Sequence, residues 1–364
     1  MIGGGPGAFI GPVHRLAAEL DREIELVAGA FSSDAGRSRA AGEAYRIDPA
    51  RAYGNVAAML TAEADRVDGI DFVAITTPNH HHFGAAKAAL EAGIPVMSDK
   101  PATATLAEAR NLAQIVTASG LPYGLTYTYS GYPLVREARA RIAAGALGSI
   151  RKVVVEYAQG WLAGEASGKQ AEWRIDPERA GEGGAIADIG VHAFHLAEFV
   201  TGRTVNRLCA DLAAVVPGRA LDDDCQVLLH FDNGARGLLL ASQIMLGERN
   251  GLRLRIYGDK GGLDWRQEDP NRLILHRADG RTEILQTGDA SLSEDARRVT
   301  RTPGGHPEGY LEAFANLYRD FARQLRSQPG SLVPGMDAGM RGMAFISAAV
   351  SASRERRGWI DFKV

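Results

Sequence analysis

The sequence has few of the features that mark secreted, membrane-spanning or metal-binding proteins. Cys209 and Cys225 are its only cysteines in 364 residues, too few for a disulfide framework and without the paired spacing of a zinc site. No apolar run approaches the roughly 20 residues that cross a bilayer, and no basic segment followed by an apolar stretch opens the chain. We therefore expect a protein of the reducing cytoplasm with no membrane partner.

Charge of one sign is also lacking. Lys and Arg total 41 and Asp and Glu total 44, so the formal charge is only −3, which gives no strong field to attract a polyanion. Nucleic acid is not expected as a partner. The 45% of hydrophobic and 23% of charged residues are typical of a globular protein, and the length suits two domains of roughly 150 residues each.

The first third of the chain alternates β-rich runs with helical ones. This alternation is typical of a parallel sheet covered by helices, so we predict an α/β fold, a doubly wound Rossmann domain, over residues 1–125. After a helix that follows the first glycines, the expected strands are 24–31, 70–77, 94–98 and 121–126, and the expected helices lie near 35–44, 55–64, 81–92 and 104–119.

The pattern changes beyond a helix predicted near 134–144. Strands follow one another directly, and residues 225–231 and 252–256 alternate as in a sheet with one apolar face. Residues 126–364 therefore read as an α+β domain with a large, mainly antiparallel open sheet. Its other expected features are a helix near 191–201, hairpin turns at Asn233-Gly234 and Asp279-Gly280, an irregular loop over 287–306, and helices near 308–326 and 337–355.

Glycines cluster at the N-terminus, at positions 3, 4, 5, 7 and 11, between a stub of a strand and a helix. Such glycines let the backbone approach a pyrophosphate that rests on the helix N-terminus, so Gly3, Gly5 and Gly7 are candidate dinucleotide-binding residues. The spacing is longer than G-x-G-x-x-G, and a flexible tail is the alternative. Only two residues precede the glycines, so the first strand is either a stub or begins upstream.

Other candidate cofactor residues follow the predicted strands. Ser32, Ser33 and Arg37 suit a 2′-phosphate, whereas Asp34 is one position late for a ribose, so NAD and NADP both stay open. Thr77, Pro78 and Asn79 end the next strand at the ligand-binding edge. Histidines follow one another at positions 80, 81 and 82. Successive side chains at a helix start point in different directions and cannot all reach one ion, so no metal is expected. Asp99 and Lys100 follow the third strand.

The densest group of polar residues lies between Gly181 and His195. If a helix begins near Asp188, then Asp188 and His192 are four residues apart on one face, with His195 three further on. A histidine beside a carboxylate is a natural proton acceptor. The alternative is an N-capping Asp188 with a buried, structural His192.

These motifs together resemble the glucose–fructose oxidoreductase / inositol dehydrogenase (Gfo/Idh/MocA) family. The resemblance rests on the glycine loop, on Asp99-Lys100-Pro101 and on Gly183-Gly184…Asp188-x-Gly190-x-His192, and it extends over the whole chain. It implies that Lys100, Asp188 and His192 line the reacting centre and that the nucleotide lies along the glycines and the Thr77–Asn79 edge. Asp99 replaces the usual glutamate, and His195 stands where an acidic residue is frequent.

The resemblance implies an NAD(P)-dependent enzyme that oxidises secondary alcohols of sugars, inositols or related polyols. We assign His192 as the base, Asp188 as its orienting carboxylate and Lys100 as the group that stabilises the alkoxide. The alternative assignment has Lys100 as the base and His192 as an anchor for the substrate. Candidate sugar contacts are Tyr127, Tyr129, Trp161, Trp173 and Arg174, with ordinary packing as the alternative for each.

Two other functions remain open at this point. The family also embraces NAD-dependent glycoside hydrolases that act by transient oxidation, and a non-catalytic sugar sensor would keep the fold without the base. The exposed face of the large sheet, with Arg253 and Arg255 on it, predicts a homodimer or homotetramer through that sheet.

Overall fold

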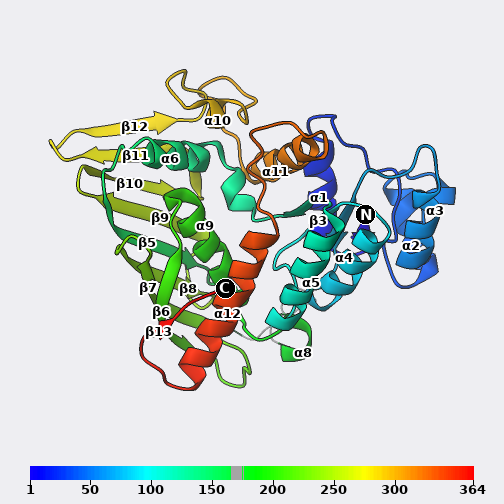
Figure 1. Cartoon of the computed structure of the whole chain (residues 1–364), viewed down its shortest axis with the longest axis horizontal. Helices are drawn as coiled ribbons and strands as arrows, with labels where there is room; N and C mark the ends of the chain where they lie inside the picture. Colours follow the sequence, from blue (N-terminus) through cyan, green and yellow to red (C-terminus); the bar gives the residue numbers. More distant parts are fainter. Residues whose placement is uncertain (165–173, 175) are drawn as a thin grey trace. The chain divides into compact units, whose positions relative to one another are not determined.

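The structure is a computed structural model, and it describes residues 1–164, 174 and 176–364 (Figure 1). The chain divides into two compact units. The first consists of Met1–Tyr127 and Phe314–Met340, and the second of Thr128–Ala313 and Arg341–Val364. Among the described residues, no helix combines the length and the apolar character that spanning a bilayer requires.

The first unit contains the predicted parallel sheet. Its four strands lie in the order β1, β2, β3, β4, every pair parallel, which confirms a Rossmann-type α/β domain. The strands are β1 (Ile2–Gly3), β2 (Val73–Thr76), β3 (Val96–Ser98) and β4 (Tyr123–Leu125). Its helices include α1 (Ile10–Glu19), α2 (Ala35–Ala44), α3 (Val56–Ala64), α4 (His82–Glu91) and α5 (Leu106–Ser119).

The strand expected over 24–31 is largely wrong. Only Gly29 and Ala30 pair there, each through an isolated parallel bridge, Ala30 with Ile2 and Gly29 with Ala52. The apolar composition of the segment was read correctly, since residues 28–31 are buried. A ladder needs a neighbour of matching length, however, and β1 is only two residues long.

Helix α11 (Tyr310–Leu325) and the start of α12 (Met336–Arg354) return to the first unit. The expected division assigned every residue after 125 to the second domain, and the structure differs from it over 314–340. Phe314 and Phe321 explain the difference, because their rings contact His14 and Phe72 at centroid distances of 4.7 and 5.2 Å. Periodicity predicts an apolar helix face but not which sheet that face covers.

The second unit is built on a nine-stranded sheet, which confirms the predicted α+β architecture. Its order is β12, β11, β10, β9, β5, β8, β7, β6, β13, and only β5 and β8 pair in parallel. The strands are β5 (Ile150–Ala158), β6 (Val205–Ala213), β7 (Asp224–Phe231), β8 (Arg236–Ser242), β9 (Gly251–Gly258), β10 (Gly261–Arg266), β11 (Asp269–Arg277), β12 (Thr282–Gln286) and β13 (Ile360–Asp361).

Two hairpin turns of this sheet are as predicted. Asn233-Gly234 joins β7 to β8 and Asp279-Gly280 joins β11 to β12. Gly234 and Gly280 have φ angles of 85° and 87°, a conformation that glycine adopts without steric cost. The turn residues therefore set the register of both hairpins.

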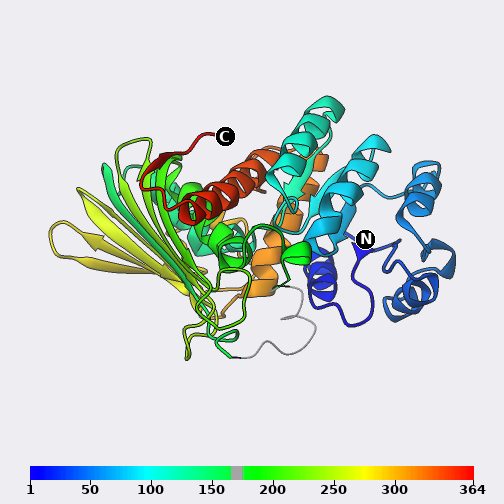
Figure 2. The same ribbon diagram turned by 90° about the horizontal axis from the view of Figure 1, so that it is seen from below.

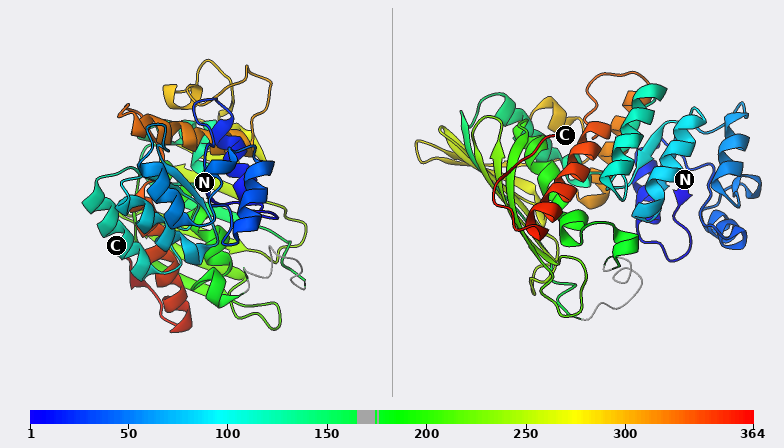
Figure 3. Two further views of the ribbon diagram at one scale, coloured as in Figure 1. Left: turned by 90° about the vertical axis from the view of Figure 1, so that its right-hand side faces the viewer. Right: turned by 60° about the horizontal axis from the view of Figure 1, so that its bottom comes forward.

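Helices cover one face of the large sheet. Helices α6 (Pro133–Ala143) and α9 (Val191–Thr201) pack on it, and in Figures 2 and 3 no helix of the described chain lies over the opposite face of the second unit. The short helices of this unit are α8 (Pro177–Ala180) and α10 (Glu294–Arg297), the latter inside the expected irregular loop. The strands alternate accordingly: Leu252, Leu254 and Ile256 of β9 are buried beneath the helices.

Candidate active site

The glycine loop approaches its surroundings too closely for side chains. A Cβ on Gly3 would lie 2.9 Å from the Thr76 backbone, one on Gly5 2.5 Å from the Phe31 carbonyl oxygen, and one on Gly11 2.3 Å from the Gly4 Cα. Helix α1 follows this loop, and no side chain within the described part of the structure caps its N-terminus. A backbone without side chains beside an uncapped helix start suits the pyrophosphate of a dinucleotide.

The segment after Phe31 lies beside this loop. Arg37 donates from Nη2 to the Pro6 carbonyl at 3.5 Å, so its guanidinium lies at the glycine loop. Asp34 caps helix α2, accepting from the Arg37 amide at 2.7 Å, and the Ser32 hydroxyl accepts from the Asp34 amide at 3.2 Å. Asp34 therefore has a structural role that the sequence did not reveal, while a ribose hydroxyl and a 2′-phosphate both remain compatible with Ser32, Ser33 and Arg37.

The edge after β2 carries Thr77, Pro78 and Asn79 as expected. The Thr77 hydroxyl oxygen is buried and has no hydrogen-bond partner among the described residues, which suits a ligand group at this edge. His82 is buried, and its ring nitrogens face the Thr77 and Pro101 carbonyls at 2.8 and 2.7 Å. His80 and His81 are exposed, so the three rings do not converge. No cluster that could hold a metal occurs in the described ranges.

Asp99 fixes the loop that carries Lys100. Its Oδ1 accepts from the Lys100 amide at 2.9 Å and from the Thr126 hydroxyl at 2.7 Å, and it lies 3.9 Å from His14 Nε2. Burial acts to raise the pKa of Asp99, but the nearby His14 imidazole, the charge of Lys100 and the hydrogen bond from Thr126 hold it below its usual range. Asp99, predicted to bind the cofactor, thus supports Lys100.

Sequence reasoning missed His14. It is buried in α1, one turn beyond the glycines, and its Nδ1 lies 2.6 Å from the Tyr318 hydroxyl of α11. The signal was a histidine on a helix face whose other residues, Gly11 and Ala17, are small and apolar, but its partners are 85 and 304 residues away along the chain. His14 connects the helix of the glycine loop to the carboxylate beside Lys100.

In the second unit, Asp188 lies in a π-helical turn, Ile186–Gly190, and α9 begins only at Val191. The expected α-helical spacing of Asp188 and His192 is therefore wrong, because a π-turn bonds i to i+5. Asp188 is not an N-cap either; Ala185 and Gly190 occupy the cap positions of the two segments.

Two side chains hold the Asp188 carboxylate. Arg174 Nε and Gln243 Nε2 both donate to its Oδ2, at 3.0 and 2.9 Å. Sequence spacing did not predict Gln243, which is 55 residues further along. Arg174, predicted to hold sugar hydroxyls, pairs with the Asp188 carboxylate in this structure.

His192 is 8% exposed and lies against two tyrosines. Its ring is edge-on to Tyr129, with centroids 4.9 Å apart and planes at 78°, and its centroid is 6.4 Å from that of Tyr157. Burial raises the pKa of both phenols, so both stay neutral over the ordinary pH range. The His192 imidazole is thus positioned by two uncharged aromatic side chains, Tyr129 and Tyr157.

The two phenols and Asn250 form a closed ring of hydrogen bonds. Tyr157 donates to Asn250 Oδ1 at 2.7 Å, Asn250 Nδ2 donates to the Tyr129 hydroxyl at 3.3 Å, and the two hydroxyls contact each other. Because each phenol has one proton, Tyr129 must donate to Tyr157. The amide cannot relay a proton through this ring, so its role is to orient the tyrosines.

The remaining predicted residues occupy different environments. Trp161 is 46% exposed, and the Arg174 guanidinium carbon lies 5.6 Å from its ring centroid, so Trp161 stays accessible while Arg174 is engaged. Tyr127 is 1% exposed. His195 stacks on Phe199 at 5.7 Å, and burial together with Arg139 lowers its pKa to about 3. Trp173 lies outside the described residues.

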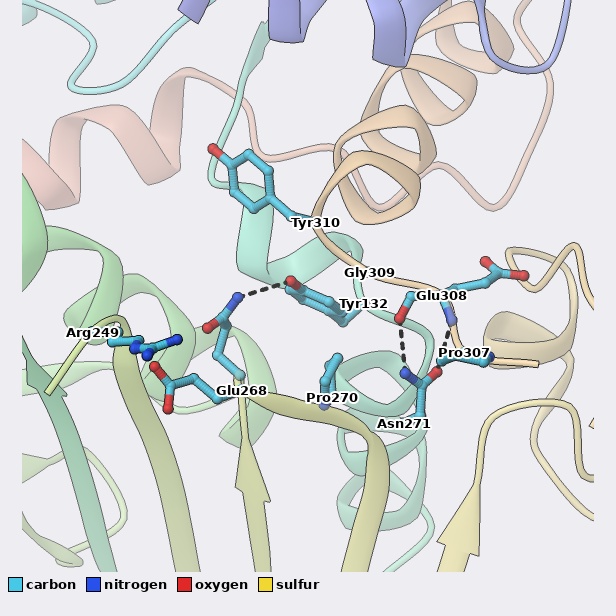
Figure 4. A pocket seen from close by; sticks show the side chains of 10 residues that line it. Tyr132, Arg249, Glu268, Pro270, Asn271, Pro307, Glu308, Gly309 and Tyr310 are labelled. Carbon is cyan, nitrogen blue, oxygen red and sulfur yellow. Dashed lines mark hydrogen bonds between the residues drawn. The ribbon is translucent and has the colours of Figure 1, made fainter. Parts of the chain in front are cut away.

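A pocket of about 650 Å³ opens in the second unit (Figure 4). Its walls include Tyr132, whose hydroxyl accepts from Gln267 at 3.2 Å, and Asn271, which exchanges hydrogen bonds with the Glu308 backbone. The Tyr132 ring is parallel to that of Tyr129 at 6.4 Å. One wall residue of the pocket, Tyr132, therefore stacks on Tyr129, which flanks His192, and the sequence did not predict this proximity.

Two family models match the chain. The oxidoreductase family with NAD-binding Rossmann fold matches residues 1–127, and the GFO/IDH/MocA C-terminal domain matches residues 135–264. The uncharacterized oxidoreductase YfiI of Bacillus subtilis is 34% identical over 100% of this chain and 96% of its own length. The chain belongs to the Gfo/Idh/MocA family. The predicted family and the predicted class, an NAD(P)-dependent oxidoreductase, are thereby confirmed.

Solved structures agree with this assignment. An oxidoreductase from Sinorhizobium meliloti is 44% identical, with a TM-score of 0.91 over 99% of this chain and 98% of that one. An inositol dehydrogenase homolog from Azotobacter vinelandii, complexed with NADH and myo-inositol, is 35% identical, with a TM-score of 0.93 over 100% and 96%. The fold of the Gfo/Idh/MocA relatives thus extends over the whole chain.

Proposed function

We propose that this protein is a dehydrogenase that moves a hydride between a secondary alcohol of a sugar, inositol or related polyol and NAD or NADP. The observation that carries the proposal is a buried histidine, His192, four residues after Asp188, whose carboxylate Arg174 and Gln243 hold, in a chain whose other unit has a glycine loop for a dinucleotide. The myo-inositol complex of the A. vinelandii homolog supports the substrate class.

The residues present suit the cofactor. The glycine loop and the start of α1 would hold the pyrophosphate, Ser32, Ser33 and Arg37 the adenosine ribose, and Thr77 to Asn79 with Lys100 the nicotinamide half. When bound, the nicotinamide accepts or returns the hydride. The protein must bind the alcohol, orient it and move its hydroxyl proton.

His192 is the proposed acceptor of that proton. Its neutral imidazole takes the proton from the substrate hydroxyl, and the negative charge of Asp188 stabilises the resulting imidazolium. The Lys100 ammonium, on a loop fixed by Asp99, donates to the oxygen as negative charge develops. The same groups act in reverse when a ketone is reduced. In the alternative mechanism Lys100 is the base and His192 is the hydrogen-bond donor. The variants described below distinguish these two mechanisms.

The test is a screen of inositols, aldoses and glycosides with NAD and with NADP, following reduced cofactor. With the best substrate, Lys100→Ala and His192→Ala should each lower kcat by about 10²- to 10⁴-fold, while the Kd of the nucleotide stays within about threefold in His192→Ala. The base is the residue whose replacement removes the ascending limb of the pH profile. Lys87→Ala is the matched control, because Lys87 is exposed and pairs only at 3.8 Å with Glu91.

Other outcomes of the screen contradict the proposal. If kcat were unchanged in both Lys100→Ala and His192→Ala, the assignment of these residues to the reacting centre would be wrong. Cleavage of a glycoside without accumulation of reduced cofactor would indicate a hydrolase that oxidises its substrate transiently. Sugar binding without any turnover would indicate a sensor.

We also propose that the protein assembles through the bare face of its large sheet. Across this face, register places Leu228, Leu238 and Val154 in one row on three neighbouring strands. The row continues to Arg255, which pairs with Glu156 at 2.8 Å, while Arg253 pairs with Asp264 at 2.9 Å. A broad, partly apolar face on which Arg253 and Arg255 already pair with carboxylates suits a homodimer or homotetramer.

The cytoplasm is the compartment we propose. Cys209 and Cys225 are both free thiols, as expected in a reducing compartment. Cys225 is buried, so its thiol is protected from oxidants.

A further inference from the structure

Asp222 holds the start of the segment that carries Asp188 and His192. Its Oδ1 accepts from the Gly184 amide at 2.7 Å and its Oδ2 from the Ile186 amide at 2.8 Å, while its backbone carbonyl accepts from Ala185 at 2.8 Å. One residue thus takes up three successive N–H groups, although it lies 36 to 38 positions away from them. Asp222 belongs to none of the motifs that indicated the function.

The need for this contact follows from the local geometry. The π-turn begins after Ala185, which offers no side-chain cap, so its first N–H groups need an acceptor from elsewhere. Gly184 makes the approach possible, because a Cβ there would lie 2.1 Å from the Asp222 carbonyl oxygen. The close contact between the start of the π-turn and Asp222 therefore requires both the small Gly184 and the Asp222 carboxylate.

Neighbouring groups hold Asp222 and extend its influence. The buried Cys225 thiol, whose pKa is raised well above its usual value by burial and by Asp222, stays protonated and donates to Oδ2 at 2.9 Å. The backbone carbonyl of the next residue, Asp223, accepts a hydrogen bond from the backbone N–H of Gln243 at 2.9 Å. The side chain of Gln243 in turn donates to Asp188. Two adjacent residues thus control the π-turn and a partner of Asp188.

We propose that Asp222 is a positioning residue for the Asp188–His192 pair, an inference that rests on the proposed function. It fixes where the π-turn begins and hence where both side chains point. Its negative charge also lies at the positive end of the π-turn and α9, so it offsets the helix dipole near His192. Among the described residues, the neutral Tyr129 and Tyr157 flank this imidazole, and Asp188, paired with Arg174, lies four residues before it in the chain.

The test compares Asp222→Asn with Asp224→Asn. The amide keeps the size of Asp222 but presents N–H groups to donors, so the turn shifts; Asp224 carries the same charge and contacts Gln226 instead, at 2.7 Å. In Asp222→Asn we expect kcat to fall by about 10- to 100-fold, the sugar KM to change less than about threefold, and the Kd of NADH to stay unchanged. The loss of negative charge should lower the pKa of His192 and move the ascending limb of the kcat profile to lower pH.

Asp222→Glu separates the two effects, because it keeps the charge and displaces the turn. Its kcat should fall while the ascending limb stays at its wild-type pH. If Asp222→Asn matches Asp224→Asn in kcat and in pH profile, or if Asp222→Glu has wild-type kcat, the inference is overturned. This failure is distinct from failure of the proposed function, because His192→Ala would still abolish turnover.

Discussion

At the scale of single residues, Asp99 links the glycine-loop helix to Lys100. Its carboxylate contacts the Lys100 amide, the Thr126 hydroxyl and His14 within the first unit. A glutamate, one methylene longer, would place its oxygens elsewhere. The conservative change from the family's usual Glu-Lys-Pro is therefore accommodated by local partners such as Thr126, and the position of Lys100 depends on them.

Replacing Asp99 with Asn should cost stability in a pH-dependent way. The folded protein lowers the pKa of Asp99, so its carboxylate stabilises the fold above the unfolded pKa of about 4, and this contribution is lost as the pH falls. We expect Asp99→Asn to lower the free energy of unfolding by about 1–3 kcal/mol at pH 7 and the difference from wild type to shrink below pH 4. Urea unfolding at several pH values measures both quantities.

The exposed Asp71 offers the control for this comparison. Asp71→Asn should leave the free energy of unfolding within about 0.5 kcal/mol of wild type at each pH. A stability loss for Asp99→Asn that is the same at pH 7 and pH 3 would mean that the carboxylate charge contributes nothing, and that the loss comes from packing alone.

At the scale of elements, local signals predicted the helices well. The helix expected over 104–119 is α5, whose first turn is closed by a Thr105–Glu108 capping box and which is followed by Gly120 in a left-handed conformation. The strand at 24–31 failed because strand formation depends on a neighbour. The π-turn at Asp188 was not predictable, since the acceptor that shapes it, Asp222, is remote in sequence.

The candidate site shows the same limit. The sequence identified Lys100, Asp188 and His192 through motifs, but not the residues that hold them, namely His14, Tyr157, Asp222, Gln243 and Asn250. Those residues share no spacing with the motif residues, because they reach the site from other helices and strands. Motifs predict which groups react, whereas contacts between distant elements determine how those groups are held.

The glycine loop gives a prediction at this scale. In Gly11→Ala the new Cβ would lie 2.3 Å from the Gly4 Cα, so the loop must move away from α1. We expect the Kd for NADH to rise by at least about tenfold, which corresponds to about 1.4 kcal/mol, measured by nucleotide fluorescence. Gly84→Ala is the control: Gly84 lies in α4 with open space around it, so alanine should keep the Kd and stabilise the helix by up to about 1 kcal/mol. Equal affinities in the two variants would contradict a pyrophosphate site at this loop.

At the scale of the whole molecule, one face of the nine-stranded sheet is covered by no helix of the described chain (Figure 3). Its exposed apolar side chains include Leu228 and Ile284, which are 45% and 46% exposed. Ion pairs between neighbouring strands hold Arg255 with Glu156 and Arg253 with Asp264. A second copy of the chain would therefore bury the apolar row between strands without separating these charges from their partners.

A carboxylate in the centre of this face should therefore break the assembly. Leu238 lies on β8 between Leu228 on β7 and Val154 on β5, so Leu238→Asp would place an unpaired charge in the middle of the proposed interface. We expect the wild type to elute as a dimer or tetramer in size-exclusion chromatography with light scattering, and Leu238→Asp as a monomer with the same circular dichroism. Leu246→Asp, at a loop position that is 83% exposed, should remain assembled. A wild type that is monomeric at micromolar concentration would mean that the protein does not assemble. A Leu238→Asp protein that keeps the oligomeric mass would mean that the interface lies on another surface.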